Sequence, residues 1–180
     1  MTNATPFRIA INGYGRIGQC VLRALYENGY RDHLQVVAIN ELSDIDTIAH
    51  LTKYDSTHGR FHGEVAVDGD NLVVNGDRIR VLRHPEPEEL PWRLLDVDLV
   101  LECSGAYSDR ATAEKHIEAG ARRLLFSQPG DPDVDRTVVF GINDGDLNGQ
   151  DVIVAAGSCT TNCLVPVIKV LDDAFGVEQG

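Results

Sequence analysis

Residues 7–18 read FRIAINGYGRIG, a short apolar run that leads into three glycines. The run predicts a buried strand, and the amphipathic pattern from residue 16 predicts a helix that stops at Gly29. Gly13 allows a tight turn, Gly15 lets the backbone approach a pyrophosphate, and Gly18 lets the helix pack closely on the strand. A strand, a glycine turn and the free N–H groups of a helix N-terminus together predict a dinucleotide-binding site.

The acidic residue Glu41 strengthens this prediction, because it follows a second predicted strand, LQVVAIN at 34–40. Its separation from the glycines is close to the roughly 20 residues typical of the motif. A carboxylate there accepts hydrogen bonds from ribose hydroxyls and repels a 2′-phosphate, which favours NAD over NADP. The pattern also fits a purely structural glycine turn beside a surface glutamate. Ser104 in ECSG and Ser127 in FSQPG end later predicted strands, so each is either a further NAD contact or an ordinary turn serine.

The rest of the chain continues the alternation of strands and helices. Helices are expected at 43–51, capped by Ser43, and at 108–120, and strands are expected within 96–105, 122–130, 137–143 and 152–158. Residues 63–84 differ, because the hairpin signals Asp68-Gly69 and Asn75-Gly76 predict a three-strand antiparallel meander. The sequence therefore predicts an α/β fold: a Rossmann-type, doubly wound, mostly parallel sheet with an antiparallel meander insertion.

The composition argues against several classes of function. The 180 residues are 43% hydrophobic and carry a formal net charge of −12, which disfavours binding to nucleic acid. No apolar run approaches the roughly 20 residues of a membrane span, and the N-terminus lacks a signal-peptide pattern. A cytoplasmic protein with no nucleic-acid or membrane partner is therefore expected. Cys20 and Cys103 fall in helix and strand patterns and are expected in the core.

The segment AAGSCTTNCLVP, residues 155–166, places Cys159 between a predicted strand and a helix expected to begin near 160–162. A helix N-terminus stabilises a reactive thiolate, and the hydroxyls of Ser158 and Thr160 could hold a phosphate or an oxyanion. Cys159 is therefore the expected nucleophile beside bound NAD. A structural cysteine, or a metal or redox pair with Cys163, are the alternatives. No metal site is expected, because no second Cys/His pair stands at metal-ligand spacing, and Cys163 is expected to be buried.

At SCTTNC the sequence resembles the phosphorylating glyceraldehyde-3-phosphate dehydrogenase family. The blocks INGYGRIG, HLTKYDSTHGRF, AGARRLLFS, FGIND and SCTTNCLVPVIKVLDD occur in family order along the whole chain. Within the family, AINEL, LPWRLLDVDLVLECSG and LLFSQPG are most similar to the erythrose-4-phosphate dehydrogenase branch. Residues 155–157, Ala-Ala-Gly, depart from the usual Ser-Asn-Ala.

The resemblance implies NAD-dependent oxidation of a small phosphorylated aldehyde, through a thiohemiacetal and a thioester on Cys159. In the erythrose-4-phosphate branch, water then releases 4-phosphoerythronate for pyridoxal 5′-phosphate biosynthesis. In the glycolytic branch, inorganic phosphate releases an acyl phosphate. By motif match, the NAD site would contain Arg16, Ile17, Glu41 and Ser127, and the substrate phosphate site would contain Ser158 and Thr160.

The resemblance also implies a division into an NAD-binding domain, 1–157, and the start of a catalytic domain, 158–180. The family's catalytic histidine would follow beyond Gly180, and none of the six histidines present lies in its motif. These 180 residues are therefore expected to bind NAD weakly without turning over aldehyde, and the full-length protein is expected to form a homotetramer. A catalytically silent NAD-binding module and a thiol-based redox or metal protein remain as alternatives.

Overall fold

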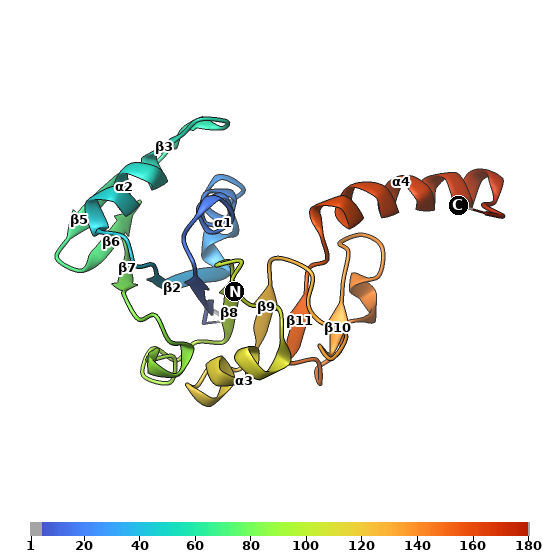
Figure 1. Ribbon diagram of the computed structural model, residues 1–180. Coiled ribbons are helices and arrows are strands. Elements are labelled where there is room, and N and C mark those ends of the chain that lie inside the picture. Colours follow the sequence, from blue (N-terminus) through green and yellow to red (C-terminus); the bar gives the residue numbers. More distant parts are fainter. Residues whose placement is uncertain (1–4, 180) are drawn as a thin grey trace.

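The computed structural model describes residues 5–179 (Figure 1). Residues 1–4 and Gly180 lie outside the described residues, so the first part of the N-terminal stretch, in which no signal peptide was expected, lies outside them too. The helices are α1 (Arg16–Glu27), α2 (Ile45–Lys53), α3 (Arg110–Glu118) and α4 (Cys159–Phe175), with short 3₁₀ turns η1 (Tyr30–Asp32), η2 (Pro87–Glu89) and η3 (Asp144–Asp146). The strands are β1 (Phe7–Asn12), β2 (Leu34–Asn40), β3 (Tyr54–Asp55), β4 (Gly59–Arg60), β5 (Val65–Asp68), β6 (Asn71–Val74), β7 (Asp77–Leu82), β8 (Leu99–Glu102), β9 (Leu124–Phe126), β10 (Arg136–Thr137) and β11 (Ile153–Ala155).

Nine of these strands form one sheet in the order β10-β11-β9-β8-β1-β2-β7-β6-β5. All neighbouring pairs from β10 to β7 are parallel, whereas β7, β6 and β5 pair antiparallel. Chain order runs outward from β1 in both directions, to β2 on one side and to β8 on the other. The predicted Rossmann-type sheet with its meander is therefore confirmed, and its switch of direction lies between β1 and β8.

Alternating side chains give the sheet two apolar faces. On β1, Ile9 and Ile11 pack in one core with Leu22 of α1 and Ile48 of α2. Ala10 points the other way, into a second core that contains Ala113 of α3. Successive side chains of a strand point to opposite faces of the sheet, and the helices that connect parallel strands lie on both of these faces. Both faces of the sheet are therefore covered, which the continuous apolar strands predicted.

Turn residues explain where the meander reverses. Asn75 and Gly76 both adopt positive φ, 49° and 88°, between the paired residues Val74 and Asp77. This is the conformation of a two-residue type I′ turn, which the Asn-Gly signal predicted. A smaller antiparallel pair, β3–β4, stands apart from the main sheet.

Several local predictions are wrong. The cap of α2 is Asp44, whose carboxylate accepts from the Thr47 amide, and not Ser43. Of the strand expected within 137–143, only Thr137 belongs to a strand, as the last residue of β10, because the chain turns after it and leaves Phe140 exposed. Helix α4 begins at Cys159, slightly before the expected 160–162.

The cysteines also depart from expectation. Cys103 is buried as predicted, but Cys20 is only partly buried and Cys163 is exposed. Cys163 was expected to be buried, yet α4 extends away from the rest of the described chain (Figure 1) and contains no buried residue. Pro166 lies inside this helix and cannot donate to the carbonyl of Asn162. Among residues 5–179, no helix is both long and apolar enough to cross a membrane.

Candidate functional site

The glycine turn between β1 and α1 is packed against the end of β8. Gly13 has a φ of +84°, and a Cβ built on it would lie 2.4 Å from the Ser104 backbone. A Cβ on Gly18 would lie 2.4 Å from the Gly13 carbonyl oxygen. Nothing lies within 4 Å of a Cβ on Gly15, so the turn is closed on its inner side and open at Gly15. That opening is what a ligand approaching the backbone requires.

Helix α1 presents uncapped amides at this opening. Gly15 is its N-cap and supplies no side-chain hydrogen bond, and the first turn contains no acidic residue. The other three α-helices of the described chain are capped by side chains of Asp44, Asp109 and Ser158. Free N–H groups and the positive end of the helix dipole therefore remain available at α1 for an anionic group such as a pyrophosphate.

Glu41 follows β2 and is held in place by its neighbours. One carboxylate oxygen accepts a hydrogen bond from the Tyr14 amide at 2.9 Å. The other accepts from the Ser43 amide at 3.2 Å and from the Ser43 hydroxyl at 3.1 Å. The carboxylate is thus oriented beside the glycine turn before any ligand binds, where it can accept hydrogen bonds from a ribose.

A cavity of about 320 Å³ joins these features at the carboxyl ends of β1, β2 and β8. Its lining consists of Asn12, Gly13, Gly15, Asn40, Glu41, Leu42, His84, Pro85, Cys103, Ser104, Ala106 and Tyr107. Of the residues predicted to bind NAD, the cavity brings together Gly13, Gly15, Glu41 and Ser104. Burial is the main reason that the pKa of the Cys103 thiol in its wall is raised to about 11, so this cysteine stays protonated at neutral pH.

The other predicted NAD residues lie around the cavity and not in its lining. Arg16 and Ile17 open α1, where Arg16 forms an ion pair with Asp55 and Ile17 is 48% exposed. Ile17 therefore does not join the packed face of α1. Gly18 packs beneath the turn, and the Ser127 amide donates to the Glu102 carbonyl at 3.0 Å.

A buried carboxylate, Glu102, supports the cavity from below. It accepts hydrogen bonds from the Asn12 amide group at 2.6 Å, from the Ser104 backbone at 2.8 Å and from the Ser104 hydroxyl. His116 Nε2 lies 3.5 Å from the same carboxylate, while His116 Nδ1 accepts from Trp92 Nε1 at 3.0 Å. Because Nδ1 is an acceptor, the proton of a neutral ring sits on Nε2 and faces Glu102. The network fixes Ser104 and the end of β1.

The charge on Glu102 gives a pH-dependent prediction. Burial alone would raise its pKa, but donors from His116, Ser104 and Asn12 outweigh burial and hold the pKa below the usual value. Glu102 therefore contributes stability that is present above its unfolded pKa and is lost as the pH falls through its lower folded pKa. We expect Glu102→Gln to cost about 1–3 kcal/mol at neutral pH, because an amide cannot accept from every one of these donors.

Urea unfolding of the wild-type protein and of the variant between neutral pH and pH 3 measures this contribution. The cost of the substitution should shrink as the pH is lowered. A cost that stays constant across the range would contradict an ionised, structurally used Glu102.

Two asparagines that end buried strands were not predicted from the sequence to be site residues. Asn12 ends β1 and Asn40 ends β2, and the Asn40 amide group donates to Asn12 Oδ1 at 2.7 Å. Asn40 also exchanges hydrogen bonds with the His84 backbone, which closes the side of the cavity. The available signal was the repeated pattern of an apolar run ending in asparagine, FRIAIN and LQVVAIN.

Cys159 occupies the first position of α4, separated from the end of β11 by residues 156–158. Ser158 caps the helix by accepting from the Thr161 amide at 2.9 Å, and Cys159 and Thr160 are both exposed. Asn162 braces the preceding turn, since its amide group donates to the Ala156 carbonyl at 2.7 Å and to the Ser158 carbonyl. Because β11 is parallel to β9, β8 and β1 in turn, the thiol lies at the same edge of the sheet as the cavity.

In the Ala-Ala-Gly departure before Ser158, the glycine has a local structural role. Gly157 adopts a φ of +70°, a conformation that strains residues with a Cβ. Glycine thus lets the chain turn from β11 into α4 without strain. Within residues 5–179, no hydrogen bond or ion pair links Cys159 to a histidine.

Two family models match this chain. The model described as glyceraldehyde 3-phosphate dehydrogenase, NAD binding domain, matches residues 7–110, and the model described as glyceraldehyde 3-phosphate dehydrogenase, C-terminal domain, matches residues 158–180. The first covers the glycine turn, Glu41 and Ser104, and the second begins at the cap of α4. Together with the uncapped glycine turn and its cavity, these matches show that the chain belongs to the glyceraldehyde 3-phosphate dehydrogenase family, whose members are NAD-dependent oxidoreductases, and that NAD is its cofactor.

Proposed function

We propose that this chain belongs to an enzyme that oxidises D-erythrose 4-phosphate to 4-phospho-D-erythronate in pyridoxal 5′-phosphate biosynthesis. The observation that carries an aldehyde-oxidising role is the exposed Cys159 at the N-terminus of α4, on the sheet edge that also forms the NAD cavity. The choice of the four-carbon sugar rests on sequence resemblance in AINEL, LPWRLLDVDLVLECSG and LLFSQPG.

The residues of the cavity fit NAD. The free amides after Gly15 suit the pyrophosphate, and the pre-oriented Glu41 suits the two hydroxyls of an adenosine ribose while repelling a 2′-phosphate. Arg16 and Ile17 at the start of α1, with Ser104 and Ser127 after β8 and β9, extend this proposed site across the switch point. When bound, NAD supplies the acceptor for a hydride.

Cys159 supplies the covalent chemistry in this proposal. Its thiolate attacks the aldehyde carbon of the substrate, forming a C–S bond and a hemithioacetal. Loss of hydride from that carbon leaves a thioester on Sγ. Water then attacks the thioester carbonyl, releases the carboxylic acid and returns the thiol. The helix dipole at the first turn of α4 stabilises the anionic thiolate before the attack.

Ser158 and Thr160 are the proposed contacts of the substrate phosphate. They flank Cys159, and Thr160 is exposed. The Ser158 hydroxyl already accepts from the Thr161 amide and lies 2.7 Å from the Thr161 hydroxyl, so it is oriented by the helix that carries the nucleophile. We further propose that residues 1–157 form the NAD-binding domain, that residues 158–180 belong to the catalytic domain, and that the complete enzyme is a cytoplasmic homotetramer without nucleic-acid or membrane partners.

Substrate preference tests the proposal. The complete gene product should reduce NAD with erythrose 4-phosphate in preference to glyceraldehyde 3-phosphate, and inorganic phosphate should not be required, because water accepts the acyl group. NADH absorbance in the four combinations of sugar and phosphate measures this.

A phosphorylating glyceraldehyde-3-phosphate dehydrogenase is the second candidate, favoured by the descriptions of the two matching family models. Strict dependence on inorganic phosphate, together with preference for the three-carbon sugar, would establish that activity and overturn the erythrose-4-phosphate assignment.

A further inference from the structure

A mixed cluster of metal-ligating side chains lies away from the NAD cavity, between α1 and the β3–β4 hairpin. It contains Cys20 of α1, Asp55 at the end of β3, and His58 in the turn that follows. One donor atom from each residue lies within 4.8 Å of the other two. Cys20 is far from the other two in sequence, so metal-ligand spacing could not have indicated the cluster.

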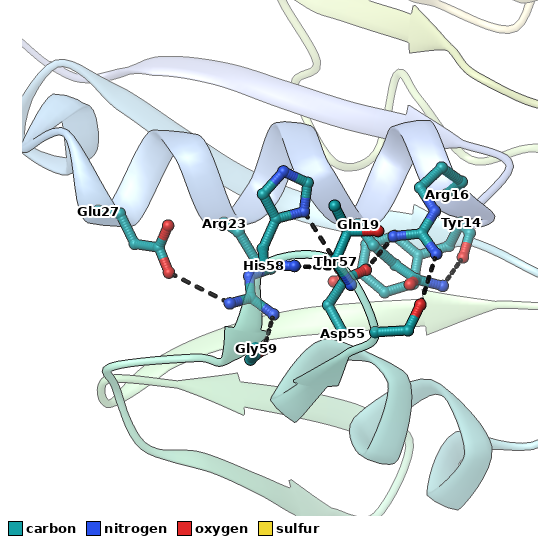
Figure 2. Close-up of polar contacts among 10 residues, drawn as sticks. Tyr14, Arg16, Gln19, Arg23, Glu27, Asp55, Thr57, His58 and Gly59 are labelled. Carbon is teal, nitrogen blue, oxygen red and sulfur yellow. Dashed lines mark hydrogen bonds and ion pairs between the residues drawn. The ribbon is translucent and has the colours of Figure 1, made fainter.

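The hairpin turn holds two of these groups in a fixed arrangement. Asp55 Oδ1 accepts from the Thr57 amide at 2.8 Å and from the His58 amide at 2.7 Å, and it lies 3.1 Å from His58 Nδ1. Figure 2 shows Asp55 joined to His58 on one side and to Arg16 on the other. The Asp55 side chain is only 4% exposed, whereas the His58 ring is 57% exposed.

The three side chains offer three kinds of donor atom: a carboxylate oxygen on Asp55, an imidazole nitrogen on His58 and a sulfur on Cys20. Asp55 Oδ1 and His58 Nδ1 lie 3.1 Å apart, a separation that two ligand atoms of one tetrahedral ion can have.

We propose that Cys20, Asp55 and His58 form a binding site for a divalent transition metal, with Zn²⁺ as the best-matched ion. Zn²⁺ takes thiolate sulfur, imidazole nitrogen and carboxylate oxygen together, whereas Mg²⁺ and Ca²⁺ select oxygen donors alone. Three protein ligands leave a fourth tetrahedral position for water.

Space for that water and for entry of the ion is present beside the cluster. A cavity of about 230 Å³ is lined by Cys20, Arg23, Ala24, Glu27, Asn28 and His58. Figure 2 shows Arg23 joined to Glu27 and to the Gly59 carbonyl, so its charge is opposed by a carboxylate. A Cys20 thiolate and the Asp55 carboxylate would balance the two charges of the ion, and Arg16 on the second Asp55 oxygen would orient that ligand.

Cobalt spectroscopy tests the site directly, because Co²⁺ bound to a thiolate gives a charge-transfer absorption band. The test uses the chain with Cys159→Ser and Cys163→Ser, which removes the two exposed thiols of α4 and leaves Cys20 as the only cysteine that is not buried. We expect one Co²⁺ per chain, with a thiolate band that Zn²⁺ abolishes and Mg²⁺ does not. Melting with Zn²⁺ should occur at a higher temperature than melting without it, since the ion binds the folded state.

Two further substitutions assign the ligands. Cys20→Ser should abolish the band, and His58→Gln should weaken Zn²⁺ binding by more than the roughly 10–100-fold typical of losing an outer-shell partner. His62→Gln, which changes an exposed histidine outside the cluster, is the matched control and should leave Zn²⁺ affinity unchanged. Because the His58 ring is mostly exposed, its replacement should leave the fold intact even if Cys20→Ser does not fold.

The absence of a Co²⁺ band, a band that survives Cys20→Ser, or equal Zn²⁺ affinities of the His58 and His62 variants would each overturn the metal site. In those cases the cluster would be an Asp55–His58 ion pair that only stabilises the hairpin. None of these measurements depends on which substrate the enzyme oxidises.

Discussion

Replacement of Gly13 by alanine is expected to destabilise the fold by about 2–5 kcal/mol and to weaken NAD binding at least about tenfold. The added Cβ would lie 2.4 Å from both Cα and N of Ser104, and 2.8 Å from the Cys103 carbonyl carbon. All of these are backbone atoms at the end of β8, which pairs with β1 and cannot move alone. The φ of +84° adds strain that glycine does not have.

The matched control is Gly15→Ala, two residues along the same turn. Its φ of −76° suits alanine, and a Cβ there meets nothing within 4 Å. We expect the free energy of unfolding of the Gly15→Ala variant to differ from that of the wild type by less than about 1 kcal/mol, because only the preference for glycine over alanine at a helix N-cap is lost. NAD binding should nevertheless weaken about tenfold, because the methyl group occupies the space through which a pyrophosphate would approach.

Urea unfolding and calorimetric titration with NAD, applied to both variants, separate the two effects. A Gly13 variant as stable as the wild type would contradict the close packing of β1 against β8. A Gly15 variant that binds NAD normally would contradict approach of the cofactor at this turn and would point to a structural turn only.

The sequence predicted the architecture because its signals are local. An apolar strand, a glycine turn and an amphipathic helix each depend on neighbouring residues, and parallel crossovers restrict how such units can be joined. The Asn75-Gly76 turn shows the same locality, since both residues adopt the positive φ that the dipeptide favours.

The supporting network around Glu102 could not be predicted, because its contacts join distant segments. Asn12 and Glu102 are separated by 90 positions, and Trp92 reaches His116 across another 24. In the sequence, Glu102 is only a polar residue that follows the apolar run LVL. Its role as an acceptor follows from the sheet order, which places β8 beside β1.

Amphipathic patterning likewise predicts an element without identifying its partner. The helix expected to begin near 160–162 is present as α4, and Leu164, Val167, Ile168 and Leu171 recur along it at helical spacing. These side chains are nevertheless between 41% and 54% exposed in the described chain. Cys163, on the same helix, was expected to be buried and is exposed. A periodic apolar face indicates helical geometry, whereas burial also requires a surface that packs against it.

Replacement of Cys159 by serine is expected to have the largest effect on activity, a loss of turnover of about 10⁴-fold or more in the complete gene product. A serine hydroxyl is not ionised at neutral pH, so no covalent intermediate forms, while the rest of the NAD site is unchanged. NAD affinity measured by calorimetry should therefore equal that of the wild type. NADH absorbance with erythrose 4-phosphate or glyceraldehyde 3-phosphate measures the loss.

Cys163→Ser provides the control, because both thiols are exposed and lie on the same helix one turn apart. Cys163 has already passed the first turn, beyond which the stabilisation of an anion by the helix dipole falls off. Its replacement should leave turnover within about twofold, since only a group that bonds to substrate carries the large loss. Alkylation by iodoacetamide, followed by mass spectrometry, should modify Cys159 faster than Cys163. Equal alkylation rates, or equal losses of turnover in the two variants, would show that the helix N-terminus does not create the nucleophile.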